Sequence, residues 1–329
     1  MRQAEPGPGL PAPGTVDATQ PREPAELRAA VLRWSAGHRR PLPGRETRDP
    51  WHVLVVEVMS QQTQIGRSLV RAEAFCERYP APEALARASA ADVVRAWAGL
   101  GYNRRALALR EAARAIAERH GGRVPSDLSD LLALPGIGPY TARAVAARAH
   151  GVAVMPIDVN IRRVLGRLTD TVRPAAMQAL GDAIAGAPAT GTSAPDPAAH
   201  PGEVADALMD IAAGVCRTRD PDCGACPLRP WCAWHARAAA TALEPGDVAA
   251  RPSRGSRRAG PGTPFPATRR WLRGQLLREL REQPAGAWSS FEGERGPHGH
   301  AAVREALAIL ADEGFVQLDE RGRARLAED

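Results

Sequence analysis

The sequence contains no lysine, and all 43 of its basic residues are arginine. No side-chain amine is therefore present to form a Schiff base, which excludes lysine-dependent covalent catalysis. The chain also has no apolar run as long as a membrane span and no basic-then-apolar leader, so we expect neither membrane insertion nor secretion. Few segments alternate with the two-residue period of a strand. This scarcity of strand-like alternation favours an all-α fold.

What is present is a chain of 329 residues, long enough for one large domain or two to three modest ones. Its net charge of +6 favours a polyanionic partner, although a solvated arginine surface explains the charge equally well. Tracts rich in proline, glycine and alanine indicate a disordered tail at residues 1–24 and a flexible loop at 186–202.

The C-terminal region combines a basic linker (236–267) with a small folded module (268–329). Between Arg251 and Arg273 there are seven arginines and no acidic residue, which suits either a phosphate-binding arm or a solvated tether. The module shows a helix, a second helix and a hairpin-like segment, and this order resembles a winged-helix module.

Four of the five cysteines, Cys216, Cys223, Cys226 and Cys232, follow the spacing C-x6-C-x2-C-x5-C. Four thiols in one short stretch favour a metal centre over disulfides, which remain the lesser alternative. Structural zinc sites usually use two short-spaced pairs, whereas here only Cys223 and Cys226 form one. One compact loop instead suits a [4Fe–4S] cluster. Cys76 lies apart on an apolar helical face, where we expect an inert core thiol.

A glycine turn, Leu134–Gly138, separates two predicted helices. Gly136 and Gly138 allow backbone amides to point outward, and amides at a helix N-terminus bind phosphate without reading sequence. Alone, such a turn is usually a mere helix connector, but its place ahead of the cysteine loop makes it more telling.

Two carboxyl groups have opposed surroundings. Glu57 is the only charged residue in the apolar run Trp51–Met59, where burial favours the neutral form. Asp158 begins a helix, whose positive dipole end favours the ionised form. Such a pair is typical of an acid and a charge stabiliser in glycosidic bond cleavage. The alternatives are a buried salt bridge for Glu57 and a plain N-cap for Asp158.

These features occur together with four longer motifs: Glu57-Val-Met-Ser-Gln-Gln-Thr-Gln64, Gly99-Leu-Gly-Tyr-Asn-Arg-Arg-Ala106, Leu134-Pro-Gly-Ile-Gly-Pro-Tyr-Thr-Ala142 and Ile157-Asp-Val-Asn-Ile-Arg-Arg-Val164. With the cysteine spacing they resemble the helix-hairpin-helix DNA glycosylases that carry an iron–sulfur loop, and among these the adenine-specific family. The resemblance implies these parts: an N-terminal helix packed on the cluster domain (25–50), a six-helix barrel (51–157) with the helix-hairpin-helix (128–150), and a [4Fe–4S] domain (158–235).

By this resemblance, Glu57 would protonate N7 of a flipped-out adenine and help activate water, while Asp158 would stabilise the cationic deoxyribose. Tyr140 stands where lyase-type relatives carry a lysine, which implies a monofunctional enzyme. Tyr140 and Asn160 would orient the carboxylates; a packing aromatic and a first-turn amide are the simpler alternatives. The implied reaction is removal of adenine opposite 8-oxoguanine or guanine in base excision repair.

The resemblance also implies DNA contacts. Gln62 would fill the gap left by the flipped base, Tyr102 would wedge beside the orphan base, and Thr63 would hydrogen-bond to it. Further DNA contacts are implied for Arg40, Arg45, Leu100, Gly136 and Gly138, with Asp206 near the adenine.

The chain departs from the family pattern at three positions: Gly44 replaces a tryptophan, Ser60 an apolar residue and Val159 a glycine. Valine does not readily adopt the positive φ that glycine permits, so we expect altered pocket geometry there. The C-terminal region is also too short for the Nudix-like domain with which many relatives recognise 8-oxoguanine.

We expect a monomer that acts on double-stranded DNA containing a mismatch, in the cytoplasm at the nucleoid and away from membranes. Three alternatives remain open: a thymine glycosylase for T opposite G, a lyase-type endonuclease, and a non-catalytic zinc-dependent DNA-binding protein. The run Gln61-Gln62-Thr63 favours adenine over thymine, and Tyr140 opposes the lyase.

Overall fold

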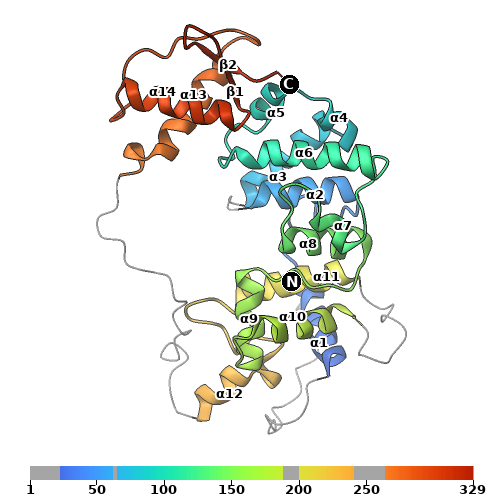
Figure 1. Cartoon of the computed structure of the whole chain (residues 1–329). Coiled ribbons are helices and arrows are strands. Elements are labelled where there is room, and N and C mark those ends of the chain that lie inside the picture. Colours follow the sequence, from blue (N-terminus) through green and yellow to red (C-terminus); the bar gives the residue numbers. More distant parts are fainter. Residues whose placement is uncertain (1–22, 62–64, 188–199, 241–263, 329) are drawn as a thin grey trace, which may run out of the picture. The chain divides into compact units, whose positions relative to one another are not determined.

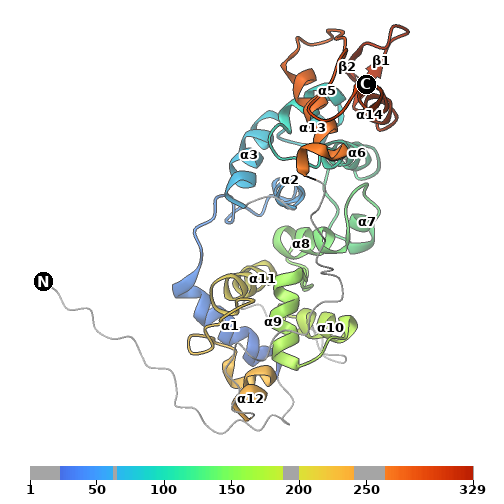
Figure 2. The same cartoon turned by 90° about the vertical axis from the view of Figure 1, so that its left-hand side faces the viewer.

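The computed structural model describes residues 23–61, 65–187, 200–240 and 264–328 (Figures 1 and 2). This part of the chain is predominantly helical and holds one two-stranded sheet, so the all-α prediction is confirmed. No helix within these ranges is long and apolar enough to cross a bilayer. The predicted tail, loop and basic linker fall largely on residues 1–22, 188–199 and 241–263, outside the described residues.

The chain divides into two compact units, one formed by residues 1–40 and 153–253 and the other by 41–152 and 254–329. The first contains these helices: α1 (Pro24–His38), α9 (Val159–Thr169), α10 (Pro174–Ala185), α11 (Pro201–Asp210), α12 (Ala233–Ala240), a π-helical turn (Ile211–Val215) and a 3-10 turn (Arg229–Trp231). Its core joins Leu27 and Val31 of α1 to buried residues of α9, α10 and α11. An N-terminal segment thus packs on helices that follow it by more than a hundred residues.

The second unit begins with seven helices: α2 (Pro50–Ser60), α3 (Ile65–Arg78), α4 (Pro82–Ala86), α5 (Ala90–Ala96), α6 (Arg104–Arg119), α7 (Leu128–Leu132) and α8 (Pro139–His150). The apolar run after Asp49 is helical rather than a strand because the Asp49 side chain accepts a hydrogen bond from the His52 amide at 2.7 Å, and Pro50 fits the first turn. In Figures 1 and 2, α2 lies beside α3 and α8. This packing brings the α2 side chains against the helix that follows the glycine turn.

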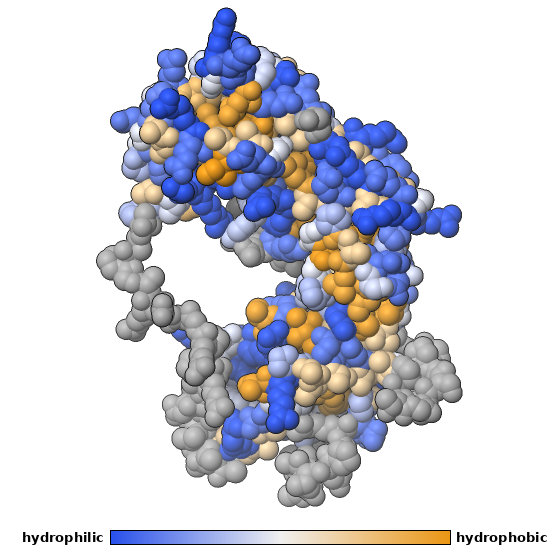
Figure 3. Space-filling view, in the orientation of Figure 1, coloured by the Kyte–Doolittle hydropathy of each residue, from blue (hydrophilic) through white to orange (hydrophobic). Residues whose placement is uncertain are grey.

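The C-terminal module comprises a 3-10 turn (Phe265–Ala267), α13 (Arg269–Glu282), α14 (His300–Asp312), β1 (Val316–Leu318) and β2 (Ala324–Leu326). Its strands pair antiparallel, which gives the predicted winged-helix-like order of elements. Figure 3 shows hydrophilic side chains over much of its visible face, around apolar patches.

The module shares a core with α5 in the second unit. Leu276 and Phe315 of the module belong to the same buried cluster as Val94. The Arg281 guanidinium donates to the Val94 carbonyl at 2.9 Å and to Asn103 Oδ1 at 2.7 Å. Burial lowers the pKa of Arg281 to about 10. A contact of this kind explains why the module is grouped with residues 41–152.

Candidate functional site

Glu57 lies in the middle of α2 and is 8% exposed. The sequence predicted a neutral carboxylic acid in an apolar pocket. The structure corrects this, because Arg148 Nη1 of α8 lies 2.6 Å from Glu57 Oε1. An adjacent guanidinium favours the carboxylate and opposes the effect of burial. The buried salt bridge, the alternative that the sequence left open, is therefore what the structure contains.

Asp158 is the N-cap of α9, as predicted. Its Oδ1 accepts hydrogen bonds from the backbone amides of Asn160 at 2.9 Å and Ile161 at 2.8 Å. Its Oδ2 accepts from Asn160 Nδ2 at 2.7 Å, and Asn160 Oδ1 in turn accepts from Arg163 at 3.1 Å. Asp158 is therefore held by Asn160 and by backbone amides at the N-terminal end of α9. Glu57 and Asp158 belong to different units.

The glycine turn joins α7 to α8. Gly136 has φ +75°, and a Cβ built there would lie 2.7 Å from Ala108 Cβ, so both backbone conformation and space require glycine. Gly138 is the N-cap of α8 with φ −91°, and no side chain caps its amides. These amides at the start of a twelve-residue helix can donate hydrogen bonds to a phosphate oxygen. Tyr140, half-buried, is the second residue of that helix.

The loop before α6 presents Tyr102, which is 41% exposed and has φ +45°, rare for a residue other than glycine. Arg105 supports it by donating to the carbonyls of Val58 and Gln61 at 2.7 Å each, and burial lowers the pKa of Arg105. Leu100 is only 5% exposed and belongs to the core. The DNA contact implied for Leu100 stays a prediction, and the side chain is largely covered by packing in this structure.

The remaining pocket residues are dispersed. Arg40 Nε contacts Oδ1 of buried Asp210 at 2.5 Å, tying the end of α1 to α11, the helix that carries Asp206. Arg45 is buried at 4% exposure. Gln62 and Thr63 lie outside the described residues.

The three departures from the family pattern have local explanations. Gly44 has φ +69°, with His52 and Glu73 within 3.0 Å of a built Cβ, so a larger residue there would be strained. Ser60 forms a hydrogen bond with Ser68 at 3.1 Å. Val159 is the first residue of α9 and is not among the described residues with positive φ, which agrees with the backbone preference of valine.

The four clustered cysteines line one small cavity of about 20 Å³. Burial raises the pKa of Cys226 to about 12 and raises the pKa of Cys223 and Cys232 as well. Arg167 of α9 donates to Cys216 Sγ at 3.3 Å and to the Arg217 carbonyl at 2.7 Å. The helix capped by Asp158 thus also holds the cysteine loop.

The cavity brings together four thiols, which are the donors that an iron–sulfur cluster uses. Across the described ranges, no three His, Cys, Asp or Glu side chains are grouped closely enough to hold one metal ion. A cubane instead binds each thiolate to a different iron, so its ligands surround a cage. None of the cysteines, all of them described, is in a disulfide. Four thiols around one cavity therefore suit a [4Fe–4S] cluster.

Sequence reasoning missed the arginines that organise both carboxylates and the cysteine loop: Arg105, Arg148, Arg163 and Arg167. Arg105 and Arg163 stand inside motifs that were recognised, and that position was the available signal. No sequence signal connects Arg148 to Glu57, which is 91 residues away.

Comparison with known proteins defines the class first. The family profile described as HhH-GPD superfamily base excision DNA repair protein matches residues 55–179. The solved structure titled "Structure of a thermostable thymine-DNA glycosylase" has a TM-score of 0.58 and 26% identity, covering 65% of this chain and 97% of that one. A non-covalent endonuclease III–DNA complex, at 19% identity and a TM-score of 0.52, shares the fold.

Full-length relatives then narrow the class. Adenine DNA glycosylase of Mycobacterium tuberculosis strain H37Rv is 41% identical over 305 residues, which are 89% of this chain and 93% of that protein. Adenine DNA glycosylase of Mycolicibacterium smegmatis is 37% identical, over 90% of this chain and 94% of its own length. The chain therefore belongs to the adenine DNA glycosylase family of the HhH-GPD superfamily.

Proposed function

We propose that this protein is a monofunctional adenine DNA glycosylase that hydrolyses the bond between adenine and deoxyribose opposite 8-oxoguanine or guanine. The observation that carries the proposal is its 41% identity to a protein of that name across 93% of that protein's length. A buried carboxylate on α2 and a helix-capping carboxylate on α9 supply the two groups that glycosidic cleavage needs.

In the proposed reaction, Asp158 stays ionised and stabilises positive charge on the deoxyribose. Glu57 donates a proton to the leaving adenine and then helps a water molecule attack the sugar. Since Arg148 pairs with Glu57 in the structure, Glu57 must separate from this arginine and take up a proton from solvent before it can donate that proton to the base. The absence of lysine leaves no amine for a covalent sugar adduct, and the product is an abasic site.

The cofactor we propose is a [4Fe–4S] cluster held by Cys216, Cys223, Cys226 and Cys232. When bound, it would cross-link the loop through four thiolates. Between the ligands, the exposed residues Arg219 and Arg229 would then be offered to a DNA phosphate. We propose that the protein works as a monomer on mismatched double-stranded DNA, in the cytoplasm at the nucleoid.

The deciding experiment is single-turnover cleavage of duplexes carrying A opposite 8-oxoguanine, A opposite G, and T opposite G. We expect release of adenine from the first two. E57Q should abolish base release while duplex binding persists, and D158N should slow the chemical step strongly. Unchanged turnover by E57Q would remove Glu57 from its role as the acid.

A thymine glycosylase is the second candidate, because a solved structure of that name covers 65% of this chain. Release of thymine from T opposite G, with adenine left in place, would establish it instead.

A further inference from the structure

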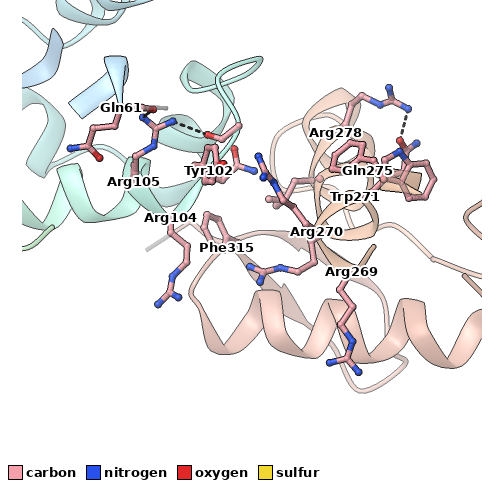
Figure 4. Close-up of a pocket in the computed structure, with 16 residues that line it drawn as sticks. Gln61, Tyr102, Arg104, Arg105, Arg269, Arg270, Trp271, Gln275, Arg278 and Phe315 are labelled. Atoms are coloured by element: carbon pink, nitrogen blue, oxygen red, sulfur yellow. Dashed lines mark hydrogen bonds between the residues drawn. The ribbon is translucent and has the colours of Figure 1, made fainter. Parts of the chain in front are cut away.

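A basic pocket lies within the second unit. A pocket of about 720 Å³ opens between the loop that carries Tyr102 and one face of α13 (Figure 4). Aromatic side chains contribute to its lining, and none of its lining residues is acidic. Six arginines line it: Arg104, Arg105, Arg269, Arg270, Arg273 and Arg278. A cavity with this composition suits a phosphate ligand, because guanidinium groups match phosphate geometry.

Three of these arginines are available for such a ligand. Arg104, Arg270 and Arg278 are exposed, and none has a carboxylate partner among the described residues. Arg269 and Arg273 are instead paired with Glu305 and Glu313. Three exposed guanidinium groups without a carboxylate partner among the described residues therefore line this one pocket.

Tyr102, one of the aromatic residues that line the pocket, lies close to two cations. The Arg270 guanidinium lies 4.1 Å from the centre of the Tyr102 ring, and that of Arg105 lies 5.4 Å from it. Figure 4 shows Tyr102 and Arg270 approaching each other from the two sides of the pocket. The module thus adds its positive charge directly beside an exposed ring in a strained loop.

We propose that this pocket binds the phosphate backbone of duplex DNA, through α13 of the C-terminal module. In helix-turn-helix proteins the second helix usually enters the major groove. Here α13, the first helix of the module, carries the unpaired arginines, whereas α14 lies outside the pocket. The contact positions DNA without reading bases. It deepens the proposed function, on which it rests for the choice of DNA as ligand.

The test is binding of an undamaged labelled duplex by the full-length holoenzyme at several salt concentrations. Each phosphate contact contributes roughly 0.9 to the slope of log K against log salt for duplex DNA. R270A/R278A should therefore lower the slope by about two and weaken binding to all sequences equally. The matched control is R304A/R321A, which removes the same charge from exposed positions of the same module outside the pocket. An equal change in both double variants would overturn the proposal.

A second variant does not depend on removing a side chain. A Cβ at Gly274, in the middle of the pocket face of α13, meets no atom within 4 Å, so a longer side chain fits. G274E should weaken duplex binding at least tenfold by placing a carboxylate among the arginines, with an unchanged melting temperature. Wild-type affinity of G274E would refute the site. Displacement of duplex from wild-type protein by equimolar ATP would assign the pocket to a free nucleotide instead.

The two proposals fail separately. Base release by the wild-type enzyme tests the glycosylase activity, whereas the salt slope on undamaged duplex tests the pocket. Adenine release with an unchanged slope in R270A/R278A would keep the enzyme and reject the pocket.

Discussion

The buried pair of Glu57 and Arg148 makes a quantitative prediction about stability. The two side chains are 9% and 19% exposed, and their closest atoms are 2.6 Å apart. At an effective dielectric constant near 20, this separation corresponds to a gross attraction of about 6 kcal/mol, which desolvation of both groups largely offsets. Removing one partner leaves the other charge buried without this ion pair. We therefore expect R148M to lose about 3–5 kcal/mol of unfolding free energy.

A double-mutant cycle isolates the pair from its surroundings. E57Q/R148M removes both charges, so it should be more stable than R148M by about 2 kcal/mol or more. The assay is urea denaturation of wild type, both single variants and the double variant, followed by circular dichroism at neutral pH. If R148M unfolded within about 1 kcal/mol of the wild type, the pair would contribute no buried ionic contact. Our account of how Glu57 is held would then be refuted.

Three further predictions follow from individual residues. Burial lowers the pKa of His150 below its usual 6.5, so the unfolded chain binds a proton before the folded chain does, and stability falls as the pH drops through 6.5. H150N should reduce this loss of stability in denaturation measured from pH 8 to pH 5. G136A should cost about 1–3 kcal/mol and weaken duplex binding in anisotropy, because its Cβ would clash with Ala108; G138A, at φ −91°, is the tolerant control. C226S should lower iron content and visible absorption, whereas C76S should not, since Cys76 lies on α3 and does not line the cysteine cavity. Equal iron loss in both would contradict the assignment.

Helix caps and turns could be predicted from the sequence because they depend on neighbouring residues. The caps at Asp49 and Asp158 depend on hydrogen bonds to amides two or three residues ahead, so sequence spacing alone predicts them. The same holds for the turn at Gly136, whose positive φ only glycine adopts readily. The four cysteines could be grouped because all stand on one short segment.

The burial of individual side chains and their distant partners could not be predicted from the sequence. Leu100 stands in a recognised motif, yet it is buried in the core. Tyr102, in the same motif, is exposed and has a positive φ. Glu57 was placed on the correct helix, but its ion-pair partner Arg148 comes from α8. Neither outcome has a local cause, since both depend on how helices pack.

The sequence by itself therefore determined the helices, their caps, the glycine turn, the cysteine loop and the absence of any amine nucleophile. Tertiary structure decided which distant side chains meet. It pairs Glu57 with Arg148 across 91 residues, lets Arg167 of α9 donate to Cys216 in the cysteine loop, and places α13 beside Tyr102. The physical reason is range. Caps and turns are set by the backbone within a few residues, whereas ion pairs, burial and pockets depend on which distant segments share a packed interior.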